Sequence, residues 1–227
     1  MKRSSTETVR KFVSHGRRYA VDLYGVVHQE DPRPFRYDAD YVSAFERPEY
    51  RAKTLALATL RLGWIMGLFN MKYGRAVESL LDVGYGSGTL MREALKAIPH
   101  VDGREIAPLP VPEGCQKVDS LSRDYDIVTF LDSLEHHQSL DIIGRLDAKL
   151  IAISVPWCHE PGGVWFDEWK HRKPDEHLHH FDVPALAAFM ASEGWTMVYE
   201  GHHEDVIRRP VDDRPNILSM AFVPRNS

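Results

Sequence analysis

The chain has 227 residues, 43% of them hydrophobic and 27% charged, and a formal net charge of −5 at pH 7. This composition is ordinary for one globular domain with an appendage, and it excludes a disordered chain or a disulfide-rich scaffold. The acidic balance argues against broad binding of a nucleic-acid backbone. Cys115 and Cys158 do not have the Cys-x-x-Cys spacing of a redox motif. The first residues form no apolar leader, and no run of 18 apolar residues occurs. We therefore expect a cytoplasmic protein with free thiols and no membrane partner.

Residues 1–75 lack strand alternation, and the apolar-rich stretch 52–69 predicts one long helix. We expect an N-terminal helical appendage or lid over 1–75 and a compact domain over 76–227, together forming one unit. From residue 80, strand-like and helix-like stretches alternate, which predicts an α/β fold with a parallel sheet. Strand candidates are 80–83, 101–106, 125–131, 150–155, 195–199 and 216–223, and later helix candidates are 90–98, 142–146 and 183–193. The proline-rich stretch 107–112 predicts a loop where a crossover helix would otherwise lie.

The most informative segment is 79–88, Ser-Leu-Leu-Asp-Val-Gly-Tyr-Gly-Ser-Gly. An apolar strand runs into three glycines, which let a small polar ligand approach the backbone closely. The third glycine comes too early for a dinucleotide fingerprint, and no lysine follows it as in a phosphate-binding P-loop. Ser87 lacks the flanking glycines of a nucleophile elbow.

The segment Asp82–Gly88 resembles motif I of class I S-adenosylmethionine-dependent methyltransferases. Val101–Ile106 is similar to the second strand of that family, and Tyr125–His136 to its fourth strand with the Leu-Glu-His of the ubiquinone-biosynthesis-like branch. The chain resembles more closely a subset of uncharacterised bacterial and phage methyltransferases, and this likeness lies in the segments 35–38, 154–158, 169–171 and 176–182. The resemblance implies a doubly wound, mostly parallel, seven-stranded Rossmann-like sheet, with S-adenosylmethionine as cofactor.

The same resemblance implies which residues bind the cofactor. Glu105 would hold both ribose hydroxyls, since one carboxylate can accept from two vicinal hydroxyls. Asp119 would approach the adenine amine, and Asp132 would meet the methionine amino group or cap the following helix. The full predicted set is Asp82, Gly84, Tyr85, Gly86, Gly88, Glu105, Asp119, Leu131 and Asp132.

Residues 156–182 show no periodic pattern but are rich in tryptophan and histidine, which is typical of a binding loop or lid. We expect the acceptor there, bound by Tyr37, Trp157, Trp169 and His171. Tyr37, Tyr41 and Arg61 of the appendage are expected to close over it. A hydroxyl acceptor would need a base, for which His136, His177 and His180 are the candidates. An amine or ring nitrogen would need only desolvation and a hydrogen-bond acceptor.

The histidines of 176–180 lack the H-E-x-x-H order, so we expect no metal. The predicted acceptor is a small molecule or a glycan, methylated on oxygen or nitrogen. A nucleobase, free or in DNA or RNA, is the alternative enzyme hypothesis; it requires the basic clusters at 2–18, 170–173 and 208–209 to share one face. A non-catalytic module that binds S-adenosylmethionine is the remaining alternative.

Overall fold

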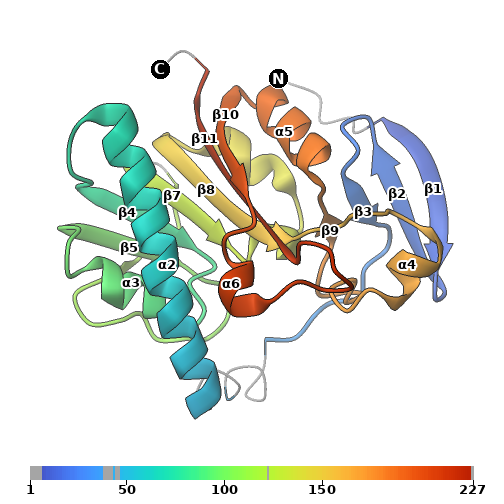
Figure 1. Cartoon of the computed structure of the whole chain (residues 1–227), viewed down its shortest axis with the longest axis horizontal. Coiled ribbons are helices and arrows are strands. Elements are labelled where there is room, and N and C mark those ends of the chain that lie inside the picture. The colour runs from blue at the N-terminus through green and yellow to red at the C-terminus, as the bar shows by residue number, and fades with distance from the viewer. Residues whose placement is uncertain (1–6, 38–42, 44–46, 122, 226–227) are drawn as a thin grey trace.

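The centre of the computed structural model, which describes residues 7–37, 43, 47–121 and 123–225, is a sheet of seven strands. Its order is β10-β11-β8-β7-β4-β5-β6; β11 is antiparallel to both β10 and β8, and the other neighbouring strands are parallel (Figure 1). The strands are β4 (Ser79–Val83), β5 (His100–Arg104), β6 (Gln116–Lys117), β7 (Tyr125–Leu131), β8 (Ala148–Pro156), β10 (Trp195–Gly201) and β11 (Ile217–Pro224). The predicted seven-stranded, mostly parallel sheet is confirmed.

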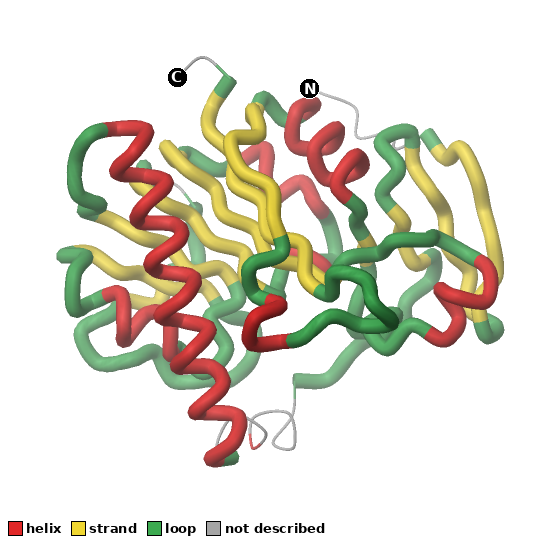
Figure 2. The backbone as a smooth tube through the Cα atoms, in the orientation of Figure 1, coloured by secondary structure: helices red, strands yellow, loops and turns green. Residues whose placement is uncertain are grey.

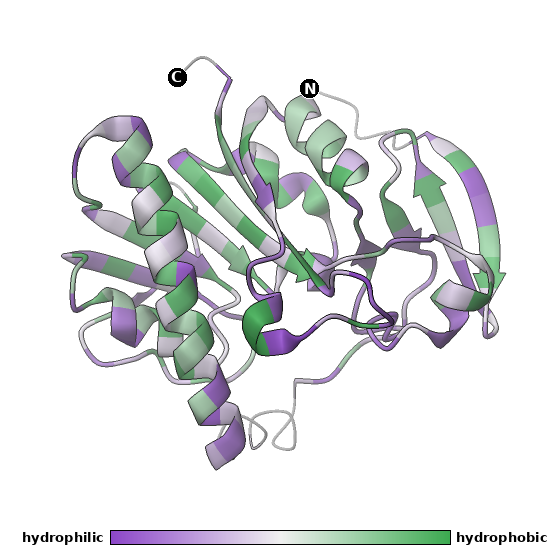
Figure 3. Ribbon diagram, viewed as in Figure 1, coloured by the Kyte–Doolittle hydropathy of each residue, from purple (hydrophilic) through white to green (hydrophobic). Residues whose placement is uncertain are grey.

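Both faces of this sheet are covered. All seven residues of β7 are buried, with Val128 and Phe130 in one hydrophobic core and Ile127 and Leu131 in the other. The first core includes side chains of α5 (Val183–Ser192), and the second includes side chains of α2 (Pro48–Tyr73) and α3 (Thr89–Ala94). A strand buried on both faces has a nearly continuous apolar sequence, as the green central strands of Figure 3 show.

The predicted long helix is present as α2, which crosses the sheet in Figure 2. Pro48 suits its first turn, and the N–H of the left-handed Gly74 donates to the carbonyl of Asn70 at its end. By length and composition alone α2 could cross a membrane, with a mean hydropathy of 1.3. Ile65 and Phe69 of this helix are fully buried in the second core, and 28% of its apolar window is buried.

A second sheet corrects the expectation that the segment before residue 75 is helical without strands. It is antiparallel, in the order β1-β2-β3-β9, with β1 (Thr8–Ser14), β2 (Arg17–Asp22), β3 (Val27–Gln29) and β9 (His179–His180). β1 is an edge strand exposed along most of its length, so its sequence carries no burial alternation. Tyr41, expected to cover the site, lies outside the described residues.

The stretch 156–182, expected to lack regular structure, contains α4 (Gly163–Glu168) and β9. Its first half packs Phe166 and Trp169 into a small core against the second sheet. Its second half returns to the main sheet, where the backbone N–H of Leu178 donates to the carbonyl of Glu135 at 2.7 Å. This one segment therefore ties the two sheets together beside the carboxyl ends of β7 and β8.

The remaining elements are short helices. They are the 3₁₀ helices η1 (Leu134–His136) and η2 (Leu140–Arg145), and α6 (Asp205–Arg208). η2 takes the place of the helix predicted at 142–146. The described residues 105–115 contain no helix, in agreement with the loop predicted from the prolines.

Candidate active site

The glycine loop leaves β4 with its backbone held in conformations that other residues rarely adopt. Gly84, Gly86 and Gly88 have φ angles of 81°, 51° and 67°. A Cβ on Gly84 would lie 2.4 Å from Cβ of Ser133, and one on Gly88 would lie 2.4 Å from Cγ of Pro112. Glycine is thus required here both by the turn and by close packing.

Glu105, just beyond β5, is fixed against this loop. Oε2 of Glu105 accepts the N–H of Gly86 at 2.9 Å, and Oε1 accepts the N–H of Ala107 at 2.8 Å. Each oxygen keeps a further lone pair for a ligand hydroxyl. Asp82, at the other side of the loop, is 4% exposed, accepts from Oγ1 of Thr129 at 2.8 Å, and has its pKa raised to about 6 by burial. The geometry suits a cofactor with vicinal hydroxyls.

A cavity of about 770 Å³ extends from the glycine loop to the loop before β9. This is within the range of small-ligand pockets, about 300–1,000 Å³. Its walls come from the carboxyl ends of β4, β5 and β7, the first half of α2 and the segment 171–178. The predicted site residues that line it are Asp82, Gly84, Tyr85, Gly86, Glu105, Leu131, Asp132, Tyr37, His136, His171 and His177.

The predicted acceptor-binding residue Trp169 and the predicted catalytic base His180 are instead part of the small core, which corrects the sequence interpretation. Trp169 is 7% exposed and packs with Phe166 and Tyr19. His180, on β9, is 2% exposed and surrounded by the rings of the same three residues, and burial lowers its pKa to about 3. Neither is among the described residues that line the cavity, so we assign His180 no catalytic role.

Three further predicted residues also lie outside the cavity lining that the described residues form. Trp157 stacks its ring on His159, with centroids 4.9 Å apart. Asp119 is exposed to solvent, and the nearby Leu121 lines the cavity in its place. Gly88 packs against Pro112, which gives it a structural role in the turn. Sequence spacing alone could not separate these exposed or packed positions from those that face the ligand.

An ion-pair network that sequence analysis did not predict forms one wall. Arg61 of α2 donates to Oδ2 of Asp132 and to both carboxylate oxygens of Glu204, at 2.7–2.8 Å. Arg208 of α6 donates to Oδ1 of Asp132 at 2.6 Å. Although burial opposes it, Arg208 and Arg61 hold the pKa of Asp132 well below its usual value. Asp132 therefore stays ionised beside the cofactor loop, in a left-handed conformation with φ of 59°.

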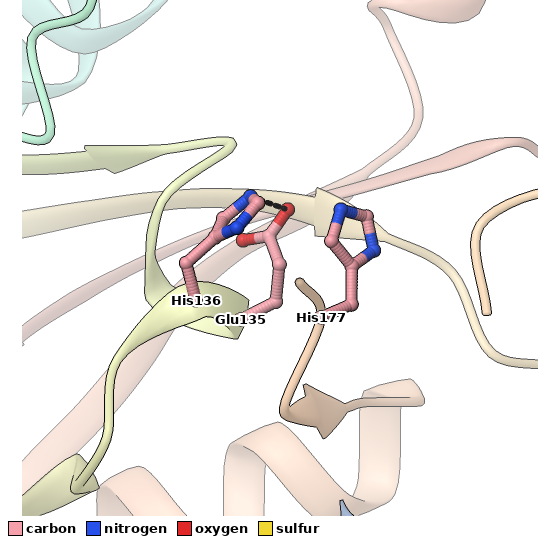
Figure 4. Close-up of side chains that lie close together, drawn as sticks. All are labelled: Glu135, His136 and His177. Atoms are coloured by element: carbon pink, nitrogen blue, oxygen red, sulfur yellow. Dashed lines mark ion pairs between the residues drawn. The ribbon is translucent and has the colours of Figure 1, made fainter. Parts of the chain in front are cut away.

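Three and four residues after Asp132 in the chain, Glu135 and His136 also line the cavity, and their side chains lie close to that of His177 (Figure 4). One oxygen or nitrogen from each lies within 4.8 Å of the other two. Glu135 is 2% exposed, and burial and then the charge of Asp132 raise its pKa to about 8. Oε2 of Glu135 and Nδ1 of His136 have no hydrogen-bond partner among the described residues. Sequence analysis singled out both histidines but missed Glu135, whose only signal is its place in Leu-Glu-His.

Replacing Glu135 by Gln should change the pH dependence of stability in a defined direction. Folded Glu135 keeps its proton up to about pH 8, whereas the ordinary value is 4.5. Unfolding therefore releases a proton between these values, and the contribution of Glu135 to stability falls as pH rises through that window. In urea titrations at about pH 5, 6.5 and 8, the free energy of unfolding of Glu135→Gln should rise relative to that of wild type at each higher pH. A difference independent of pH would contradict the raised pKa.

Comparison with known proteins agrees with this site. The sequence profile of the methyltransferase domain family matches residues 48–200. No curated protein matches the chain. A similar solved structure is the Burkholderia thailandensis 1,6-didemethyltoxoflavin-N1-methyltransferase, at 18% identity and TM-score 0.50, covering 94% of this chain and 97% of that one. Another is the magnesium protoporphyrin IX methyltransferase from Synechocystis PCC 6803, at 14% identity and TM-score 0.52, covering 77% and 84%.

The family match covers more than half of the chain, and the solved structures share its fold. The glycine loop and Glu105 supply the features that the cofactor of this family requires. The chain therefore belongs to the methyltransferase domain family and is an S-adenosylmethionine-dependent methyltransferase of class I fold.

Proposed function

We propose that the protein methylates a small-molecule acceptor, on oxygen or nitrogen, inside the cavity beside the glycine loop. The observation that carries this proposal is the continuity of the cavity, which joins Glu105 and the glycine loop to the Glu135, His136 and His177 side chains. Bound S-adenosylmethionine supplies a methyl group that is already activated, so the protein has to orient the acceptor and exclude water. The half-buried Tyr37 and the segment 171–178 would do this.

Similar folds support a small acceptor. The Burkholderia thailandensis enzyme was crystallised with 1,6-didemethyltoxoflavin and S-adenosylhomocysteine, and the Synechocystis enzyme with S-adenosylhomocysteine. The Leu-Glu-His sequence at 134–136 favours placement in the ubiquinone-biosynthesis-like branch, and the further segments favour the bacterial and phage subset. The sequence also favours a cytoplasmic location. These finer assignments are part of the proposal.

Nucleic-acid substrates are less favoured because cations of the N-terminal basic cluster are paired with acids. Arg17 donates to Asp175, and Lys11 to Glu30. Both pairs lie on or beside the second sheet, whereas Arg208 faces the cavity and Asp132. Paired charges of this kind reduce the basic field that a polynucleotide would need.

The proposal predicts that the protein binds S-adenosylmethionine and S-adenosylhomocysteine. The substitution Gly86→Arg should abolish the binding of both compounds. Gly86 lines the cavity with φ of 51°, so an arginine would be strained and would fill the space of the cofactor. The matched control is Gly63→Arg, at an exposed helical position with open space around it. Calorimetry should show binding to wild type and Gly63→Arg only.

Acceptors should then be screened by release of S-adenosylhomocysteine, with small aromatic and aliphatic compounds, free sugars, and single-stranded DNA and RNA in parallel. Turnover confined to polynucleotides, with binding that weakens steeply with salt, would favour the nucleobase alternative. Absence of calorimetric binding of either cofactor form to folded wild-type protein would overturn the proposed function.

A further inference from the structure

The hydrogen bonds of His177 determine which of its ring nitrogens faces the cavity cluster. Nδ1 lies 2.7 Å from the carbonyl oxygen of His171. A carbonyl can only accept, so Nδ1 carries the hydrogen. Burial, followed by the charges of His136 and Lys173, lowers the pKa of His177 well below its usual value, which keeps the ring neutral. Nε2 therefore holds an unprotonated lone pair.

The groups around this nitrogen are themselves held without net charge. Glu135 keeps its proton at neutral pH because burial raises its pKa to about 8, and burial lowers the pKa of His136. The nearest charges on the same loop, Lys173 and Glu176, form a pair at 3.1 Å. The ring of His136 meets that of His177 edge to face, with centroids 4.6 Å apart. The uncharged groups next to Nε2 favour an uncharged acceptor group at this point, while ionised side chains such as Asp132 and Arg208 line other parts of the same cavity.

Two aromatic side chains contribute to the cavity wall. Phe35 and Tyr37 both line the cavity, with ring centroids 5.1 Å apart. Burial, and then the carboxylates of Glu105, Glu176 and Glu135, raise the pKa of Tyr37 to about 12. The two rings lie at 71° to each other, so each can offer an aromatic face or edge to a flat ligand ring.

We propose that the acceptor is a planar aromatic molecule whose acidic hydroxyl or ring N–H donates to Nε2 of His177. This inference rests on the proposed function and narrows its acceptor class. An imidazole that resists protonation is a weak base, and weak bases remove only protons that are already acidic. Phenol-like hydroxyls and heteroaromatic N–H groups meet that condition, whereas the hydroxyls of a sugar do not. The geometry thus favours a small aromatic acceptor over a glycan acceptor.

The proton and charge balance of the transfer step is simple. The acceptor proton passes to Nε2 of His177 while the acceptor lone pair forms the bond to the methyl carbon, and the carbon–sulfur electron pair stays on sulfur. The positive charge of the sulfonium is thereby replaced by that of the His177 imidazolium.

The test uses the full chain, labelled with ¹⁵N-histidine and saturated with S-adenosylhomocysteine, in long-range ¹H–¹⁵N spectra at about pH 6–8. His177→Gln assigns the resonance. We expect Nε2 of His177 to be unprotonated, and to shift when 4-nitrophenol is added but not when its methyl ether, 4-nitroanisole, is added. His180, buried outside the cavity, is the internal control and should not respond.

In addition, His177→Leu should weaken 4-nitrophenol binding roughly tenfold, as expected for one lost hydrogen bond, with little change for 4-nitroanisole. A protonated Nε2 at neutral pH, or an Nε2 resonance unmoved by 4-nitrophenol, would overturn the inference. Calorimetry of S-adenosylhomocysteine on the same sample distinguishes the two failures. If the cofactor product binds and His177 does not respond, only the acceptor class is wrong.

Discussion

Glu105→Ala is expected to weaken binding of S-adenosylmethionine about 100-fold without unfolding the protein. The carboxylate is positioned by the N–H groups of Gly86 and Ala107, so the substitution removes the ribose acceptor and also releases the glycine loop. A hydrogen bond to a charged group contributes roughly 1.5–3 kcal/mol, and two such bonds correspond to about 100-fold or more in affinity. Calorimetric titration with S-adenosylmethionine measures the effect directly.

The matched control for this prediction is Asp119→Ala. Both residues are acids that follow strands of the same sheet edge, but Asp119 is exposed and lies outside the cavity lining. Its replacement should leave cofactor affinity within about twofold of wild type. Equal losses in both variants would point to a general charge effect, and an unchanged affinity in Glu105→Ala would remove Glu105 from the cofactor site.

The parts of the fold that sequence predicted are those specified by local patterns. The buried strands β4, β7 and β8 are short apolar runs, and the loop after β4 needs glycine at positions 84 and 88 for local turns and packing. Such signals lie within a few residues of each other in the chain. The glycine loop, Glu105 and the carboxyl end of β7 could therefore be located before the structure was known.

The remainder depends on contacts between distant segments. β9 is only two residues long and pairs with β3 across about 150 positions of sequence, so nothing local shows that His180 faces a core. Trp169 has the composition of a ligand-binding residue but fills that same core. Likewise, the partner of Arg61 lies 143 residues away at Glu204. Residue type alone did not separate the side chains that line the cavity from those that fill the small core.

Arg61→Ala should be the most destabilising of the substitutions considered. Glu204 is fully buried and receives two short hydrogen bonds from Arg61. Among the described residues, removal of the guanidinium leaves this buried carboxylate with the longer contact to Arg208 alone, at 3.4 Å. Breaking a buried ion pair from one side costs about 3–5 kcal/mol. In a chain of this size we expect a fall in Tm on the order of 10 °C, measured by calorimetry.

Two further variants separate the charge effect from lost packing. Lys96→Ala removes an exposed pair with Glu93 and should change stability by less than about 0.5 kcal/mol. The double replacement Arg61→Met with Glu204→Leu removes both charges and should recover most of the stability lost in Arg61→Ala, because no buried charge is left unpaired. If the double variant is as unstable as the single one, Arg61 stabilises the fold through packing of its side chain.

The double variant also tests what the network does for the cavity. Asp132 has a left-handed backbone and is 32% exposed in its side chain, and Arg61 and Arg208 together hold both of its oxygens. Without Arg61, the Asp132 carboxylate loses one of its two arginine contacts, even when the buried charge of Glu204 has been removed; the bond from its backbone N–H to the carbonyl of Ser154 remains. We therefore expect recovered stability but weakened cofactor binding, by about tenfold, since strained residues persist only where their surroundings hold them. Full recovery of both properties would show that Arg208 alone positions Asp132.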